Sequence, residues 1–118
     1  VRERCPSTLR VISVNQMGNI VVTVQNPAGK LGKGKNGLCI DFANAKTGKN
    51  VAMSFLRIDA TLRLGHVEAA RAVTETVPIG IGLYCVRVTL SLPGTWKLTF
   101  KYAESTKKEK VSLFATTT

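Results

Sequence analysis

Few side chains in this sequence could bind a metal, and they are scattered along the chain. Soft metal ions in proteins are held by thioether, thiolate or imidazole ligands. The chain offers two methionines, three cysteines and a single histidine. A metal site built from Met17, Met53 and His66 is an alternative interpretation and not the first one, and no other cofactor is expected.

The three cysteines leave an odd thiol whichever pair is joined. Cys39 and Cys85 fall at matching outward positions on expected strands that could be neighbours in one sheet. A disulfide between them requires Cα atoms within about 7 Å. Two unpaired thiols remain an equal alternative. Cys5 is left over as a free thiol, an intermolecular link or a tether.

The segment 29–36, Gly-Lys-Leu-Gly-Lys-Gly-Lys-Asn, nearly matches a phosphate-binding P-loop. Asn36 stands where the metal-binding hydroxyl belongs. The segment also runs into an expected strand instead of the helix whose N-terminus would bind phosphate. The pattern therefore predicts a basic loop that can touch an anionic surface, and not a nucleotide site.

Catalysis has little support in the sequence. His66 has no neighbouring serine or cysteine nucleophile, and the seven carboxylates are scattered along the chain. Asp41 and Asp59 have no carboxylate partner that the sequence can identify. We therefore expect a protein that is not an enzyme.

The charge is strongly unbalanced, with 17 Lys and Arg against 7 Asp and Glu and a formal net charge of +10. Such an excess attracts nucleic acid, an anionic membrane surface or an acidic protein. Nucleic acid is ranked last of these partners, because the sequence shows no clustered exposed aromatic residues for base stacking. The expected basic contact surface consists of Lys30, Lys33, Lys35, Lys107, Lys108 and Lys110.

Short blocks of alternating apolar and polar residues predict seven or eight β-strands. Turn-forming residues separate most of these blocks, including Pro78 to Gly82 and Leu92 to Gly94. Residues 62–71 contain good helix formers but are interpreted as a loop leading into a strand. The expected strands are Leu9 to Val14, Ile20 to Val24, Leu38 to Phe42, Val51 to Ile58, Ala69 to Val77, Leu83 to Leu90, Trp96 to Tyr102 and Val111 to Ala115.

Alternation also assigns the two faces of the later strands. The large side chains of Trp96, Leu98, Phe100 and Tyr102 share one parity, and polar side chains occupy the other. In the preceding strand, Tyr84, Val86, Val88 and Leu90 likewise point inward. These aromatic residues are therefore expected to build the core and not a binding site.

A chain of 118 residues has the length of one domain, 1–118, with 1–7 and 116–118 as extensions. Its apolar runs fall short of the roughly 18 residues of a membrane span. Val1 does not open a signal peptide, although such a segment could have been removed before it. The fold class expected is an all-β, immunoglobulin-like antiparallel β-sandwich of seven to eight strands.

Three motifs in the second half of the chain carry a family resemblance. They are a turn at residues 46–51, Lys-Thr-Gly-Lys-Asn-Val, and two strand beginnings in which Gly82 precedes Tyr84 and Gly94 precedes Trp96. In this order they resemble the YtkA-like and FixH-like domains, a bacterial family of extracytoplasmic immunoglobulin-like sandwiches. The resemblance covers roughly residues 29 to 103. The two glycines permit tight turns, and the aromatic residues after them cover the ends of the core.

The resemblance implies a function as well as a fold. Members of that family handle copper, assist the assembly of membrane-bound oxidases or form modules of efflux adaptors. The methionine-rich loop expected for copper is represented here by residues 62–66, Leu-Arg-Leu-Gly-His, without a methionine. The first interpretation is therefore a non-enzymatic, extracytoplasmic accessory subunit that binds another protein of a larger, membrane-associated assembly. Copper handling and non-specific binding of an anionic polymer are the alternatives.

Overall fold

The computed structural model describes residues 9–104 and 107–117, which form two antiparallel β-sheets packed as a sandwich. Sheet A has the strand order β1-β2-β3-β7-β6, and sheet B has the order β5-β4-β8-β9. The strands are β1 (Arg10–Met17), β2 (Ile20–Asn26), β3 (Gly34–Asn44), β4 (Phe55–Leu64), β5 (Val67–Arg71), β6 (Thr74–Gly80), β7 (Leu83–Leu90), β8 (Gly94–Glu104) and β9 (Lys107–Thr117).

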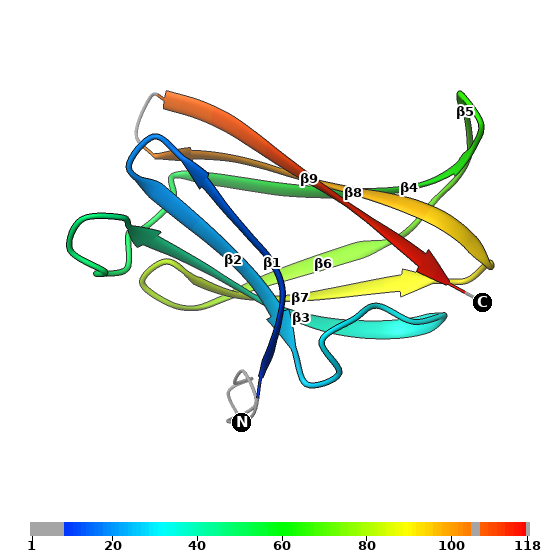
Figure 1. Ribbon diagram of the computed structural model, residues 1–118, viewed down its shortest axis with the longest axis horizontal. Helices are drawn as coiled ribbons and strands as arrows, with labels where there is room; N and C mark the ends of the chain where they lie inside the picture. Colours follow the sequence, from blue (N-terminus) through cyan, green and yellow to red (C-terminus); the bar gives the residue numbers. More distant parts are fainter. Residues whose placement is uncertain (1–8, 105–106, 118) are drawn as a thin grey trace.

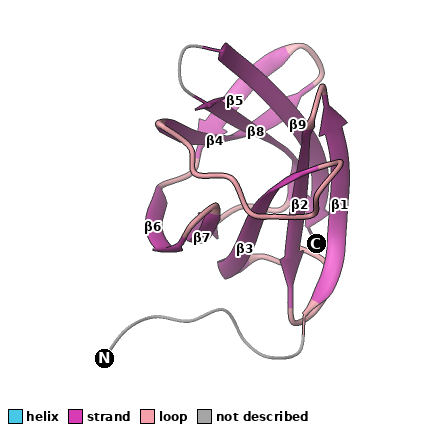
Figure 2. Ribbon diagram, turned by 90° about the vertical axis from the view of Figure 1, so that its left-hand side faces the viewer, coloured by secondary structure: helices cyan, strands magenta, loops and turns pink. Residues whose placement is uncertain are grey.

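The two layers can be followed in both ribbon views. In Figure 1 the long strands β4, β8 and β9 of sheet B cross the upper half, and β3 and β7 of sheet A cross the lower half. Figure 2, turned by 90°, shows the sheets curving toward each other where β1 of sheet A lies beside β9 of sheet B. No helix among the described residues is long and apolar enough to cross a membrane.

The core lies between the sheets and follows the alternation of the sequence. Trp96, Leu98, Phe100 and Tyr102 are at most 2% exposed, as the sequence predicted. They pack in one cluster with side chains of sheet A, which include Val22, Val24, Ile40, Phe42, Val86, Val88 and Leu90. Because each strand places alternate residues on one face, the polar residues between them form the two outer faces of the sandwich.

Two aromatic residues close the ends of this core through a polar atom. Trp96 Nε1 donates a hydrogen bond to the carbonyl oxygen of Leu92 at 3.1 Å. Tyr84 Oη accepts one from the backbone N–H of Met53 at 3.4 Å, and its ring meets that of Phe42 edge-on. A Tyr or Trp at such a position buries its ring and still satisfies its polar group.

The described residues form nine strands, so the prediction of seven to eight was wrong. The extra strand arises because one of the eight expected strands is divided into two. The expected strand Ala69 to Val77 is two strands in different sheets, β5 in sheet B and β6 in sheet A. Between them, the N–H of Ala72 still bonds to Ala60 of β4, whereas the carbonyl of Val73 already accepts from Thr89, which lies in β7. The chain therefore changes sheets within two residues, and residues 62–71 form the β4–β5 hairpin instead of a loop.

Three further boundaries differ from the sequence-based expectation. The expected strand Val51 to Ile58 begins only at Phe55 and continues to Leu64, because β4 pairs with β8 from Phe55 to Arg63 and Leu64 pairs with β5. Pro78 belongs to β6 and not to a turn. The expected C-terminal extension is partly strand, since Thr116 and Thr117 pair with β8. The expected extension 1–7 lies outside the described residues.

Candidate functional site

The residues proposed for copper do not converge. Met17 ends β1 and Met53 precedes β4, and both side chains are half-buried against the core. His66 is exposed in the turn after β4, so the whole of that strand separates it from Met53. Ten strand residues span about 30 Å. Among the described residues there is also no group of three or more His, Cys, Asp or Glu that could hold a metal ion.

Cys39 and Cys85 lie directly opposite each other on β3 and β7, as neighbouring strands of one sheet. The proposed disulfide between them is nevertheless not formed. Cys39 belongs to a disulfide, whereas Cys85 retains a thiol, so the sulfur of Cys39 is already used. Burial raises the pKa of the Cys85 thiol. Cys5 lies outside the described residues.

The expected basic contact surface is divided between two parts of the molecule. Lys30 and Lys33 are exposed in the loop between β2 and β3, and Lys35 lies on the outer face of sheet A. Lys108 and Lys110 lie on the outer face of sheet B. These residues therefore cannot act as one surface. Lys107 begins β9, but its side chain is outside what the structure describes.

The basic loop has a defined shape that does not resemble a phosphate site. The side chain of Asn36 accepts a hydrogen bond from the N–H of Gly32 and donates to the carbonyl oxygens of Gly32 and Gly34. The loop then enters β3. The residue that replaces the P-loop hydroxyl therefore organises the loop itself, and no helix N-terminus follows it.

A larger concentration of positive charge covers the outer face of sheet B. The described residues place seven Lys and Arg there against two carboxylates, Asp59 and Glu68. Along β4, β8 and β9 these side chains alternate with inward-facing residues, and Arg71 of β5 pairs with Thr61 of β4, so all seven project to the same side of the sheet. The basic residues are Arg57, Arg63, Arg71, Lys97, Lys101, Lys108 and Lys110.

Register places three of these cations in a row. Arg57 of β4 pairs with Lys101 of β8, and Lys101 pairs with Lys110 of β9. Directly opposite residues on neighbouring strands have Cβ atoms about 5 Å apart, and like charges in such pairs destabilise a sheet. The row therefore concentrates positive charge at a local cost in stability.

The two carboxylates neutralise only the β4–β5 side of this face. Asp59 bonds to Arg57 at 3.3 Å and to Arg71 at 3.5 Å, and Glu68 bonds to Arg71 at 2.9 Å. On the other side, four lysines of β8 and β9 on this face form no ion pair within the described part of the chain. Those lysines are Lys97, Lys101, Lys108 and Lys110.

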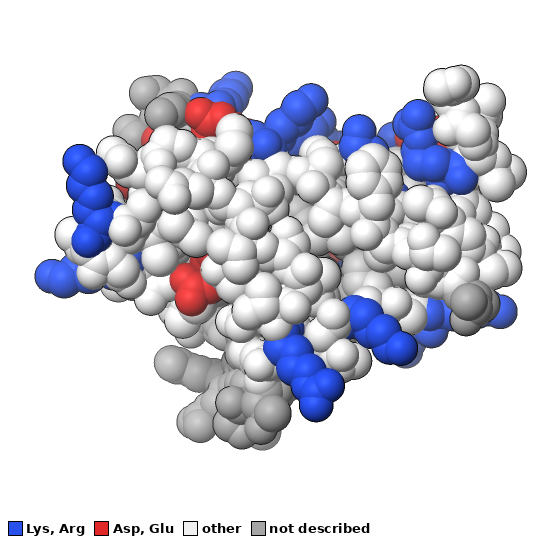
Figure 3. All heavy atoms as spheres, in the orientation of Figure 1, with Lys and Arg blue, Asp and Glu red and all other residues white. Residues whose placement is uncertain are grey.

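The outer face of sheet A is balanced by comparison. Its strands β3, β6 and β7 place two cations, Lys35 and Arg87, beside two carboxylates, Asp41 and Glu75. Glu75 and Arg87 lie directly opposite each other. In Figure 3, Lys and Arg follow the upper border of the molecule above β8 and β9, and others stand at its left and lower borders, while the middle of the view is largely uncharged.

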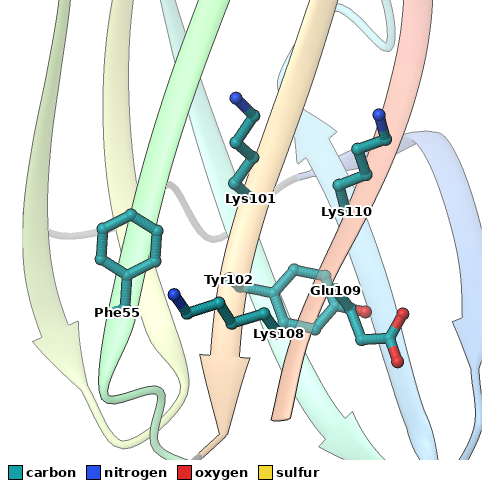
Figure 4. Close-up of a pocket in the computed structure, with 6 residues that line it drawn as sticks. All are labelled: Phe55, Lys101, Tyr102, Lys108, Glu109 and Lys110. Atoms are coloured by element: carbon teal, nitrogen blue, oxygen red, sulfur yellow. The ribbon is translucent and has the colours of Figure 1, made fainter. Parts of the chain in front are cut away.

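A shallow depression lies at one end of the basic face. Phe55 stands at one side, Lys101, Lys108 and Lys110 surround it, and residues 102 and 109 complete the lining. Ala103, which pairs with both Phe55 and Lys108, is 3% exposed and contributes only a methyl group to the outer face. In Figure 4 the side chain of Lys108 extends across β8 toward the Phe55 ring.

Phe55 and Phe114 are the aromatic residues that sequence reasoning missed. Both lie on the outer face of sheet B, where Phe55 is 48% exposed and Phe114 is 67% exposed. The signal was ambiguous because each has apolar neighbours in sequence, Leu56 beside Phe55 and Leu113 beside Phe114. Only pairing with β8 decides which of the two neighbours points outward.

Comparison with known proteins identifies no relative. No family model, curated protein or solved structure matches the chain.

Proposed function

We propose that the protein is a non-enzymatic binding module whose surface for an anionic partner is the outer face of sheet B. The observation that carries the proposal is the row of Arg57, Lys101 and Lys110 on three adjacent strands. A face that only keeps a protein soluble has charges of both signs interspersed. Three like charges at strand spacing instead lower the stability of the unbound sheet, and an anionic partner would relieve their repulsion.

The unequal distribution of ion pairs supports the same surface. The lysines of β8 and β9 are not neutralised by described residues, so they retain their full attraction for an external anion. The chain's overall charge of +10 adds long-range attraction, and the local excess on sheet B gives that attraction a direction.

The test compares two substitutions that change the net charge equally. Lys101→Glu places a carboxylate in the centre of the row, and Lys35→Glu places one on the outer face of sheet A. Each lowers the net charge by two. We expect Lys101→Glu to weaken retention on a polyphosphate matrix much more than Lys35→Glu, with the difference shrinking as salt rises. Equal effects of the two substitutions would show that only net charge matters and would refute the proposal.

A second candidate function is the accessory subunit that binds another protein. It is favoured by the outer face of β1, where Val11 and Val14 are 54% and 58% exposed on an edge strand. Affinity purification of the tagged protein, followed by mass spectrometry, tests it. A defined complex that survives in the wild type and is lost in a Val14→Asp variant would support this function, and a solitary protein would refute it.

We also propose the finer classification suggested by the sequence. The orders β3-β7-β6 and β5-β4-β8-β9 support an immunoglobulin-like fold, because they correspond to strands B-E-D and C′-C-F-G of such domains. Membership of the YtkA-like and FixH-like group and an extracytoplasmic location stay proposals. Their support is the glycine and aromatic motif at Gly82, Tyr84, Gly94 and Trp96.

A further inference from the structure

The depression around Phe55 combines two features that a merely basic surface does not need. It has an exposed aromatic ring, and it has three lysines within the same lining. Neither Phe55 nor Phe114 stacks on another aromatic ring of the described chain, since the ring contacts found there join Phe42 to Tyr84 and Tyr102. Both rings are therefore available to a ligand.

The two exposed rings lie at opposite ends of the basic face. Phe55 pairs with Ala103 of β8, and Phe114 pairs with Lys97 of the same strand. Six residues of a strand cover about 20 Å. Lys101 and Lys110 lie between these two rows, so a chain crossing the face from one ring to the other would pass over cations on the way.

We propose that this face binds single-stranded nucleic acid, with a base stacked on Phe55 and phosphates held by Lys101, Lys108 and Lys110. The inference rests on the proposed function and names its ligand. Base stacking on an exposed aromatic side chain beside basic residues is how many proteins hold single strands without reading their sequence.

Other anionic ligands fit the same residues less well. A planar bilayer cannot enter a depression, whereas a flexible chain can. An acidic polysaccharide presents many hydroxyl groups. Besides its lysines and Phe55, the described lining of the depression offers them one carboxylate, Glu109, but no Asn, Gln, Ser or Thr, and the hydroxyl of Tyr102 is buried. Duplex DNA keeps its bases stacked on each other, so Phe55 would gain nothing from it.

The experiment measures the binding of a fluorescently labelled deoxythymidine oligomer by anisotropy, over a series of salt concentrations. A length of about twelve nucleotides lies within the range of roughly 4–16 nucleotides that single-strand-binding domains of another fold cover. If three lysines each neutralise one phosphate, the logarithm of affinity should fall with the logarithm of salt with a slope of about −2. Lys101→Gln should reduce that slope by about 0.7.

Phe55→Ala is the decisive variant, with Phe55→Tyr as its conservative partner. Loss of the ring should weaken oligomer binding by roughly tenfold, and tyrosine should restore it. The residue is 48% exposed, so the variant should remain folded. Ile81→Ala, which removes an exposed apolar group from the turn between β6 and β7, is the matched control and should leave binding unchanged.

A polyphosphate chain separates failure of this inference from failure of the proposed function. We expect it to bind more weakly than the oligomer, to be insensitive to Phe55→Ala and to be weakened by Lys101→Glu. Two results would overturn the nucleic-acid inference alone. One is an affinity for the oligomer that Phe55→Ala does not change, and the other is tighter binding to duplex DNA, polygalacturonate or anionic phosphatidylserine vesicles. If neither polyphosphate nor the oligomer binds, the proposed function fails as well.

Discussion

Gly82→Ala is the substitution whose effect on stability the structure defines most sharply. Gly82 lies between β6 and β7 with a φ of 67°, in the left-handed region that side chains disfavour. A methyl group there would meet the carbonyl oxygens of Val51 and Phe42 at 2.6 and 2.7 Å and the nitrogen of Val51 at 2.9 Å. These are backbone atoms that cannot rotate away.

The contacted atoms also belong to a set of hydrogen bonds that holds three segments together. Phe42 donates its N–H to Gly82, and Val51 donates its N–H to Phe42. The left-handed conformation costs alanine about 1–2 kcal/mol. Overpacking adds about 1–3 kcal/mol, and the lower entropy of the unfolded alanine chain offsets up to about 1 kcal/mol. The expected loss is therefore about 1–5 kcal/mol, with the middle of the range at about 3 kcal/mol.

Gly48→Ala is the matched control. Gly48 has a φ of 74°, but an added methyl group would meet no atom within 4 Å. Gly48→Ala should therefore lower the free energy of unfolding only through the disfavoured backbone conformation, by about 1 kcal/mol. Urea unfolding followed by circular dichroism gives both values, with the midpoint shifted and the slope unchanged. If the two substitutions destabilise the protein equally, the close backbone contacts at Gly82 do not carry the cost.

Three other predictions concern buried or reactive groups. Tyr102→Phe should leave stability unchanged or raise it by up to about 1 kcal/mol in urea unfolding, because the buried Tyr102 hydroxyl has no hydrogen-bond partner among the described residues; a clear loss of stability would contradict this. The Cys85 thiol should react with iodoacetamide more slowly than a peptide cysteine near pH 8, and the gap should close as pH rises through its raised pKa; equal rates would be the contrary result. Because burial raises that pKa, the Cys85 thiol loses its proton at a lower pH in the unfolded state than in the folded state. Its contribution to the free energy of unfolding should therefore fall as pH rises above about 8.5. Trp96→Phe should cost about 2 kcal/mol through a cavity and the lost bond to Leu92, measured by thermal unfolding, and a change below about 0.5 kcal/mol would argue against that contact.

The faces of most strands could be predicted from the sequence because side-chain direction in a strand is a local property. Trp96, Leu98 and Phe100 alternate with polar residues, so any sheet that buries one of them buries all three. The same argument correctly placed Val86 and Leu90 in the core. It failed at Phe55 and Phe114, because each has an apolar neighbour in sequence. Alternation then does not indicate which of the two side chains faces the core.

Strand boundaries were harder to predict from the sequence wherever strand-forming residues continue without a break. Residues 69–77 form one uninterrupted pattern, yet the chain leaves sheet B and joins sheet A near Val73. The partners that decide this change, Ala60 and Thr89, are distant in sequence. The sequence left the pairing of Cys39 open for a related reason, since direct opposition of Cys39 and Cys85 does not tell which other sulfur Cys39 has already bonded.

The sequence by itself determined an all-β sandwich, its core side chains and a large positive charge, because composition and the two-residue period act locally. Tertiary structure alone decided where that charge is concentrated. Arg57, Lys101 and Lys110 are far apart in the chain or separated by a turn, and only the register of β4, β8 and β9 places them in one row beside Phe55. The proposed binding of an anionic partner depends on that register, because such a partner would contact side chains of several neighbouring strands at once.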